Sequence, residues 1–248
     1  MPRLEGRIVI VTGATSGIGR AICERCAQEG ALVVANGRRQ TALEELEAGH
    51  RDHLVPHPAD LAEPGECERL VARACELGEL RGVVHAAGTV RRGEDPRSTT
   101  AAEFEAFMRT NLTPAFELTS AACAAMSDGA GGSIVLLGSQ LAHVGIPGYE
   151  TYTAAKGGVT AMARAFAAEA GPYGVRVNVL APGVVQTPMA YVDREDFDEL
   201  IPGIAARHPL RRIGVPKDLA GPAVFLLSDD AAWVTGHTLI VDGGFTAV

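Results

Sequence analysis

The sequence lacks an excess of positive charge. Its 248 residues include 22 lysines and arginines against 30 aspartates and glutamates, a formal net charge of -8. Nucleic acids and anionic membranes are bound mainly through clusters of basic side chains. We therefore expect neither as a partner. Lysine is especially scarce, because only Lys156 and Lys217 occur.

Long apolar runs are also missing. No stretch approaches the roughly 18 apolar residues that a membrane-spanning helix needs, and residues 1–6 lack the apolar run of a signal peptide. We therefore expect a cytoplasmic protein.

Cysteine is too sparse to form a disulfide framework. Two of the five cysteines, Cys23 and Cys26, have CxxC spacing, but they fall inside a predicted helix and no second pair with metal-ligand spacing follows. We interpret them as small buried side chains and expect no metal site.

Short apolar strands alternate with helical segments along the whole chain. The expected strands cover residues 7–12, 31–36, 53–57, 82–86, 133–138, 175–181 and 237–241. The expected helices cover residues 19–29, 41–47, 63–77, 102–126 (interrupted locally by Pro114), 152–170 and 217–227. This alternation predicts an α/β fold, a Rossmann-like doubly wound parallel sheet of about seven strands with helices on both faces. We expect one domain over residues 1–248, with a mobile, partly helical substrate lid near 188–209.

A glycine-rich turn separates the first strand from the first helix. Gly13, Gly17 and Gly19 form a GxxxGxG pattern in a strand–turn–helix–strand context. Glycines there let the backbone approach a pyrophosphate, and the helix N-terminus supplies amide donors. A tight turn without a ligand is the alternative interpretation.

Three polar residues suggest acid–base chemistry. Tyr152 and Lys156 lie four apart on a predicted helix and so share a face. A nearby ammonium lowers the pKa of a phenol toward the operating pH. Ser139 follows a buried strand and emerges at the sheet edge where ligands bind. The alternative is that Tyr152 and Lys156 are an ordinary amphipathic pair.

With these motifs in order, the whole chain resembles the short-chain dehydrogenase/reductase family. The matching positions are Thr12-Gly13-x-x-x-Gly17-x-Gly19, Asn111, Ser139, Tyr152-x-x-x-Lys156, Asn178 and Pro182-Gly183. The resemblance implies an NAD(P)-dependent oxidoreductase that interconverts a small-molecule ketone and a secondary alcohol.

The resemblance also implies roles for individual residues. Tyr152 would be the general acid–base, Ser139 would polarise the substrate oxygen, Lys156 would lower the pKa of Tyr152 and hold the nicotinamide ribose, and Asn111 would hold a relay water. The implied cofactor-binding residues are Gly13, Thr15, Ser16, Gly17, Ile18, Gly19, Arg38, Arg39, Asp60, Leu61, Ala87, Gly88, Tyr152, Lys156, Pro182, Gly183, Val185 and Thr187. Asn111 as a helix cap, Asp60 as an N-cap and Thr187 as a turn residue are the alternatives.

One motif departs from the family. The family often has Asn-Asn-Ala-Gly where this chain has His85-Ala86-Ala87-Gly88. The bracing that the two asparagine amides provide must be supplied by other groups. We interpret His85 as a hydrogen-bonded histidine at a strand end and not as a catalytic one.

The end of the second strand bears on the choice of nucleotide. It reads Asn36-Gly37-Arg38-Arg39 and has no carboxylate to bind a ribose 2′-hydroxyl. A guanidinium suits a 2′-phosphate, so we predict NADP(H), with NAD(H) possible. Solvated arginines at a helix start are the alternative.

The substrate and the assembly are less constrained by sequence. The expected substrate-contacting residues are Gln140, His143, Tyr149, Gln186 and Met189. Two other functions remain open, a 3-oxoacyl-[acyl-carrier-protein] reductase and a non-catalytic NADP-binding regulatory or structural subunit. Relatives in this family commonly form tetramers, so we expect a homotetramer or a homodimer.

Overall fold

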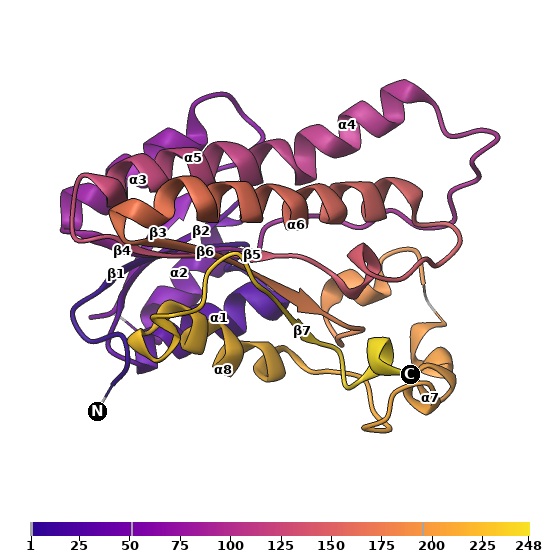
Figure 1. The fold of residues 1–248 in the computed structure, drawn as a ribbon. Helices are drawn as coiled ribbons and strands as arrows, with labels where there is room; N and C mark the ends of the chain where they lie inside the picture. Colours follow the sequence, from indigo (N-terminus) through magenta and orange to yellow (C-terminus); the bar gives the residue numbers. More distant parts are fainter. Residues whose placement is uncertain (1, 51, 195) are drawn as a thin grey trace.

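Seven parallel strands form the centre of the molecule (Figure 1). The computed structural model describes residues 2–50, 52–194 and 196–248, and its sheet has the order β3-β2-β1-β4-β5-β6-β7. The strands are β1 (Ile8–Thr12), β2 (Leu32–Gly37), β3 (Leu54–Pro58), β4 (Leu80–His85), β5 (Gly132–Leu137), β6 (Val175–Pro182) and β7 (Thr238–Val241). The predicted doubly wound parallel sheet is confirmed.

Helices cover both faces of this sheet. The helices α1 (Gly17–Gln28), α2 (Gln40–Ala48) and α8 (Pro216–Leu227) share one apolar core with the sheet. The helices α3 (Glu66–Leu77), α5 (Thr113–Ser127) and α6 (Glu150–Ala170) share the other. Helix α4 (Ala101–Asn111) contacts α5 and α6, and α7 (Phe197–Ala206) lies near the C-terminus.

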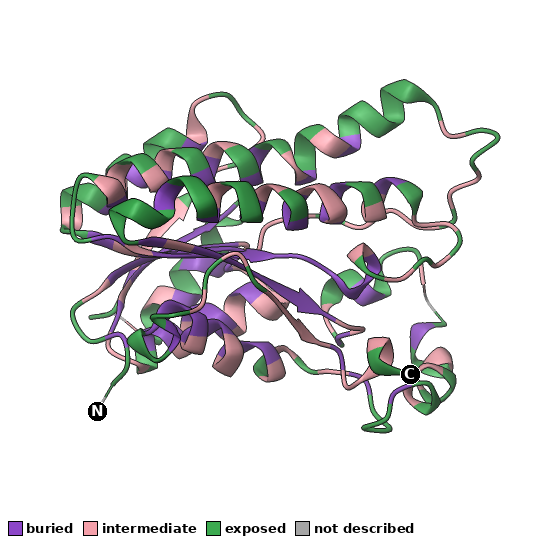
Figure 2. Ribbon diagram, viewed as in Figure 1, coloured by how far each residue is buried: buried purple, intermediate pink, exposed green. Residues whose placement is uncertain are grey.

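Strand β1 shows how the sequence produces two cores. Successive side chains of a strand point to opposite faces of the sheet. Ile8 and Ile10 accordingly pack with α3, α5 and α6, whereas Val9 and Val11 pack with α1, α2 and α8. Figure 2 shows the central strands mostly buried and the outer helix surfaces exposed, while the edge strands β3 and β7 are largely intermediate. In the described ranges, no helix combines the length and apolarity needed to cross a bilayer.

The predicted helix over residues 102–126 is two helices. Helix α4 ends at Asn111, and α5 begins at Thr113 with Pro114 in its first turn. Proline has no backbone N–H and fits best in the first turn of a helix, so Pro114 starts a new helix instead of continuing the old one. The break places Asn111 at the end of α4, where its side chain is buried.

The strand order places a ligand site between β1 and β4. There the chain changes direction along the sheet, and a crevice forms outside the carboxyl ends of the strands. Beyond β6, a short 3-10 turn, η3 (Pro188–Tyr191), and α7 pack around a small core of their own made by Ala190, Phe197 and Ile213. The segment predicted as a lid is therefore partly helical and lies over this edge.

Candidate active site

A cleft of about 540 Å³ opens at the carboxyl ends of the central strands. It is lined by the glycine turn after β1, by the segments that follow β2, β4, β5 and β6, and by part of α6. A volume of this order suits a small organic ligand. The segment around α7 and Phe245, near the C-terminus, also line the cleft.

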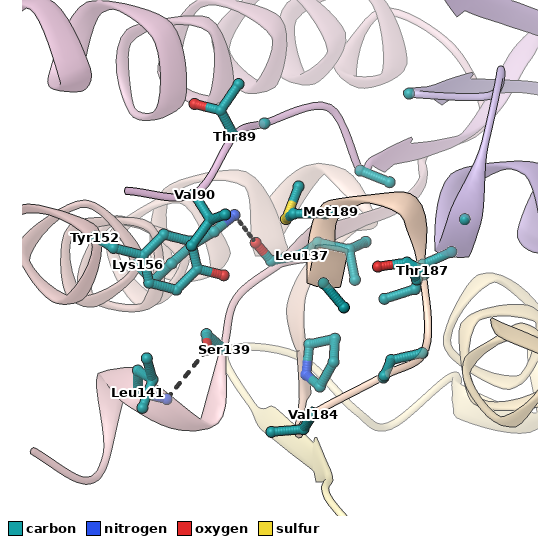
Figure 3. A pocket seen from close by; sticks show the side chains of 18 of the residues that line it. Thr89, Val90, Leu137, Ser139, Leu141, Tyr152, Lys156, Val184, Thr187 and Met189 are labelled. Carbon is teal, nitrogen blue, oxygen red and sulfur yellow. Dashed lines mark hydrogen bonds between the residues drawn. The ribbon is translucent and has the colours of Figure 1, made fainter. Parts of the chain in front are cut away.

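Ser139 and Tyr152 direct their hydroxyl groups into the same part of this cleft (Figure 3). Ser139 lies two residues beyond β5, and its Oγ accepts a hydrogen bond of 3.1 Å from the amide of Leu141. Tyr152 lies in the first turn of α6. Lys156, one helical turn later, donates from Nζ to the carbonyl oxygen of Leu137 at 2.7 Å.

The electrostatics of this group differ from the sequence-based expectation. Burial raises the pKa of Tyr152, and the hydrogen bond with Ser139 and the charge of Arg92 act against that rise. In the protein alone, Lys156 Nζ donates to the Leu137 carbonyl and not to the phenol, and it lies 6.0 Å from the centre of the phenol ring. Burial also lowers the pKa of Lys156 to about 8.

Asn111 lies beside this group but not on the cleft wall. Its Oδ1 accepts from the Thr89 amide at 2.7 Å, and its Nδ2 donates to Thr89 Oγ1 and to the Phe107 carbonyl. A Cβ added to Gly88 would lie 3.1 Å from Asn111 Oδ1 and 3.8 Å from Lys156 Nζ. Asn111 therefore ends α4, as one alternative held, and also fixes the loop that passes beside Lys156.

The glycine turn is packed too closely to accept side chains. Gly13 has φ of +67°, and a Cβ there would lie 2.9 Å from the Ala87 amide nitrogen. A Cβ on Gly19 would collide with the carbonyl oxygen of Gly13. Ser16 precedes α1 without capping it through its side chain. The first turn of α1 thus presents amide donors and a hydroxyl to the cleft, which suits a dinucleotide pyrophosphate.

Comparisons with known proteins agree with this site. The family model described as enoyl-(acyl carrier protein) reductase matches residues 13–246. The 3-oxoacyl-[acyl-carrier-protein] reductase of Haemophilus influenzae is 35% identical over 97% of this chain and 98% of its own. An L-rhamnose 1-dehydrogenase (NAD(P)(+)) of a Sphingomonas species is 38% identical over 98% of each chain. A short-chain type dehydrogenase/reductase from Mycobacterium marinum has a TM-score of 0.91 at 29% identity, covering 99% of this chain and 97% of its own.

The chain belongs to the short-chain dehydrogenase/reductase family. The relatives are dehydrogenases and reductases of alcohol or carbonyl groups, so the protein is an oxidoreductase of that class and not a non-catalytic subunit. Enzymes of this family use NAD(P)(H).

The start of the enzyme's helix α6 is fixed by a residue that sequence reasoning missed. Glu94, in the loop between β4 and α4, accepts a hydrogen bond of 2.8 Å from the amide of Thr151. Its side chain is only 1% exposed, and Arg91 Nε lies 3.3 Å from it. A carboxylate at a helix N-terminus is stabilising. Glu94 thereby positions the turn that carries Tyr152, and only the fold reveals a partner 57 residues away.

The departure from the family's Asn-Asn-Ala-Gly motif is compensated by Thr12. Its Oγ1 accepts from the amides of Ala86 and Ala87 at 3.1 and 3.0 Å and lies 3.0 Å from His85 Nδ1. His85 Nε2 has no partner among the described residues, so the expectation of a hydrogen-bonded histidine holds for one ring nitrogen only. Burial lowers the pKa of His85 to about 3, and Lys156 adds to that effect.

The nucleotide end of the cleft differs in detail from the expectation. Arg38 lines the cleft and lies 3.7 Å from Asp60. Asp60 does not line it, and its Oδ1 accepts from the Ala62 amide at 3.1 Å within a turn; the N-cap alternative is wrong, because Gly65 is the N-cap of α3. Arg39 donates to the Thr15 carbonyl and so supports the glycine turn. Leu61 is part of the apolar core because it is 5% exposed.

Most of the predicted site residues meet in this cleft. Those on its wall are Gly13, Thr15, Ser16, Gly17, Ile18, Gly19, Arg38, Ala87, Gly88, Ser139, Gln140, Tyr149, Tyr152, Lys156, Pro182, Gly183, Val185, Thr187 and Met189. Among the predicted substrate residues, His143 and Gln186 are exposed and lie outside it. Gln186 instead donates to the Tyr191 hydroxyl.

Among the further wall residues, Phe245 was not predicted; Arg194 and Arg207 fall in the segment 188–209 expected as the lid, and for Arg92 the sequence left open an anionic substrate or an ordinary exposed loop arginine. Arg92 follows β4, Arg194 and Arg207 flank α7, and Phe245 lies near the C-terminus. Arg92 and Phe245 lie more than 150 residues apart in the sequence, so no local pattern predicts that these side chains meet. Within the described ranges, no cluster of three or more His, Cys, Asp or Glu side chains is suited to a metal. Cys23 and Cys26 are buried in the core, as interpreted.

Proposed function

We propose that the enzyme interconverts a small-molecule ketone and a secondary alcohol with NADP(H), with Tyr152 as the general acid–base. The observation that carries the proposal is the convergence of the Ser139 and Tyr152 hydroxyls in a cleft that continues to the glycine turn. When bound, the nicotinamide ring supplies the hydride acceptor for oxidation and the hydride donor for reduction.

In the oxidation direction, Ser139 donates a hydrogen bond to the substrate oxygen and Tyr152, as the phenolate, takes the hydroxyl proton. The C–O bond becomes C=O as the hydride leaves the carbinol carbon. Reduction runs the same steps backwards, with Tyr152 donating its proton. Lys156, buried behind the phenol, holds the nicotinamide ribose, and Asn111 positions the loop and a relay water beside it.

A screen of substrates tests this proposal. The protein is incubated with NADP+ or NADPH, and separately with NAD+ or NADH, against sugars, sugar acids, cyclic ketones, steroids and acyl thioesters, while nicotinamide fluorescence is followed. We expect turnover for at least one alcohol–ketone pair, and none with Tyr152→Phe. Intact nucleotide binding without turnover of any pair would contradict the proposal.

The preference for NADP(H) is part of the proposal. Arg38 is the charged side chain at the nucleotide end, and no carboxylate in the described part of the chain lines the cleft to accept from a ribose 2′-hydroxyl. Asp60 lies 3.7 Å from Arg38 and partly offsets its charge. We expect Arg38→Asp to weaken NADP(H) binding at least tenfold and to favour NAD(H). An unchanged affinity for NADP(H), or a wild-type preference for NAD(H), would contradict it.

The substrate half of the proposed site includes an unpaired acceptor. Gln140 is 3% exposed, and its Oε1 has no partner within the described residues although the side chain lines the cleft. A buried carbonyl oxygen of this kind costs free energy unless a ligand donates to it. We therefore assign Gln140 to the substrate, with Tyr149 and Met189 beside it. Residues 188–209 act as the lid that excludes water.

Reduction of 3-oxoacyl groups on acyl carrier protein is the second candidate. It is favoured by the identity to the Haemophilus influenzae reductase, which carries that activity in its name. Comparing one 3-oxoacyl group on the carrier and on a short free thioester separates the two functions. A specificity constant for the carrier-bound form far above that of any free ketone would favour the second candidate.

We also propose a homotetramer or a homodimer. Phe116 on α5 is 53% exposed and lies 5.6 Å, ring to ring, from Phe166 on α6. An exposed aromatic pair on adjacent helices suits helix packing against a second copy. The expected result is a mass of two or four chains at micromolar concentration, reduced by Phe116→Glu. A monomeric mass for the wild type would contradict this.

A further inference from the structure

The charge of the cleft is opposite to that of the molecule. The chain has a formal net charge of -8, yet no aspartate or glutamate of the described ranges lines the cleft. Arg92, Arg194 and Arg207 line it instead, together with Arg38 at the nucleotide end. A concave site lined by one sign of charge concentrates ligands of the other sign.

Arg91 and Arg92 are adjacent in the loop after β4, but only Arg91 is paired with carboxylates among the described residues. Arg91 is neutralised, because its guanidinium lies 2.7 Å from Glu103 and 3.3 Å from Glu94. Arg92 donates to the carbonyl oxygens of Val192 and Met189 at 2.6 and 3.0 Å. Neutral carbonyls satisfy hydrogen bonds but leave the full charge in place, and within the described residues no carboxylate lies within the 4 Å of an ion pair with Arg92.

Arg92 lines the same cleft as the reacting groups. Its charge lowers the pKa of Tyr152, so it acts at the phenol that handles the substrate oxygen. Solvent would screen the effect on Tyr152 of a charge that lay outside the cleft. An anionic group next to the reacting carbon would therefore face Arg92.

Arg207 supplies a second cation without a counter-charge. Its guanidinium lies 4.8 Å from the centre of the Phe245 ring, and both side chains line the cleft. A cation–π contact orients a guanidinium and leaves its outer N–H groups free. In the part of the chain that the structure describes, no carboxylate forms an ion pair with it.

We propose that the substrate is a hydroxy or oxo acid whose carboxylate is bound by Arg92 and Arg207. This inference rests on the proposed function and narrows it. Ser139 and Tyr152 bind the oxygen on the carbon that is oxidised or reduced, and the substrate carboxylate offsets the positive charge of the two arginines. An acidic carrier protein fits less well, because Arg92 is half-buried and lines the same cleft as Tyr152.

The test compares acids with their own neutral amides. The pairs are 3-hydroxybutyrate with 3-hydroxybutyramide and gluconate with gluconamide, oxidised with the preferred nucleotide. We expect each acid that reacts to exceed its amide at least tenfold in kcat/KM. The ratio should fall at least fivefold in Arg92→Met and in Arg207→Met. It should persist in Arg73→Met, which removes the same charge from α3, outside the cleft.

A binding measurement covers the case in which neither pair reacts. Malonate is titrated into the protein–NADPH complex at constant ionic strength, with chloride as the control, and nicotinamide fluorescence is followed. We expect saturable millimolar binding that Arg92→Met abolishes and Arg73→Met retains. Three results would overturn the proposed carboxylate site. They are amides with the same kcat/KM as their acids, an acid-to-amide ratio that is unchanged in both cleft variants, and malonate binding no stronger than chloride binding. Turnover of neutral ketones would leave the proposed function standing, whereas no turnover of any pair in the broad screen would remove it.

Discussion

The two halves of the cleft are built in different ways. The nucleotide half consists of backbone and small residues at the ends of β1 and β4, where Gly13 and Gly19 are packed against neighbouring main chain. The substrate half consists of long side chains from the β4–α4 loop, the segment around α7 and the C-terminus, such as Arg92, Arg207 and Phe245.

This difference separates what is shared in the family from what varies. A backbone surface offers the same amide donors whatever the neighbouring side chains are, so it suits a common dinucleotide. A surface of side chains carried by loops can change its charge and shape without disturbing the sheet. Ser139 and Tyr152 lie at the junction, which is where an oxygen and a hydride acceptor must meet.

Removing the acid–base group should have the largest effect. Tyr152→Phe deletes one hydroxyl at the junction, and we expect kcat to fall about 10²- to 10⁴-fold because general acid–base catalysis is lost. The dissociation constant of NADP(H) should change less than about threefold. Tyr173→Phe, on the surface outside the cleft, is the control and should retain most activity. A Tyr152→Phe enzyme with more than a tenth of wild-type kcat would refute the assigned role.

A methyl group in the nucleotide half should come next. Gly19→Ala sets a Cβ against the Gly13 carbonyl, so the turn must shift and the affinity for both nucleotides should drop at least tenfold. Gly221→Ala in α8 is the matched control, since a Cβ there meets nothing within 4 Å. Isothermal calorimetry with NADP+ measures both. Equal affinities for the two variants would mean that the turn does not bind the nucleotide.

The charge of Arg92, in the substrate half, acts on Tyr152 at the junction. Removing that charge should shift the pH dependence of oxidation. The guanidinium lowers the pKa of Tyr152, and oxidation requires the phenolate. In Arg92→Met the pKa rises, so the rise of kcat/KM for oxidation should move to higher pH. The profile is best recorded with a neutral alcohol, which does not itself bind through Arg92. A profile that stays in place, or moves to lower pH, would contradict the effect.

The smallest effect concerns stability at the end of β4. His85 has a folded-state pKa of about 3 against an ordinary 6.5, so below pH 6.5 the unfolded chain binds a proton that the folded chain excludes. Stability is therefore lost as the pH falls. Between pH 7 and pH 5 this group alone should cost about 2 kcal/mol.

Urea unfolding of the wild type and of His85→Asn measures that loss. The variant restores the side chain usual in the family and has no group that titrates there, so it should lose about 2 kcal/mol less over the same pH interval. Parallel losses in the two proteins would show that folding does not lower the pKa of His85.

The sequence predicted the nucleotide half better than the substrate half, for a physical reason. Gly13, Gly17, Gly19, Ser139, Tyr152 and Lys156 lie at fixed offsets within strand–turn–helix units, so local patterns place them. The interruption of the helical stretch near Pro114 was predicted too, because proline stops a helix, and the break lies at Leu112. The contact between Arg207 and Phe245 was missed because it depends on how α7 and the C-terminus pack.

Hydrogen-bond partners of the polar side chains were equally hard to predict from the sequence. The carboxylate of Asp60 accepts a hydrogen bond within its own loop, and the carboxylate of Glu94 accepts one at the start of α6. The spacing of residues in the sequence predicts neither partner. The pKa of Tyr152 likewise depends on burial and on Arg92, which no helix offset reveals.

The most direct test of the central claim follows one hydrogen atom. NADPH carrying deuterium at C4 of the nicotinamide is incubated with a ketone substrate from the screen, and the product alcohol is analysed by mass spectrometry. With wild-type enzyme, deuterium should appear on the carbinol carbon from one face of the nicotinamide only, and Tyr152→Phe should bind NADPH without transferring it. Transfer that persists in Tyr152→Phe at the wild-type rate would contradict the account.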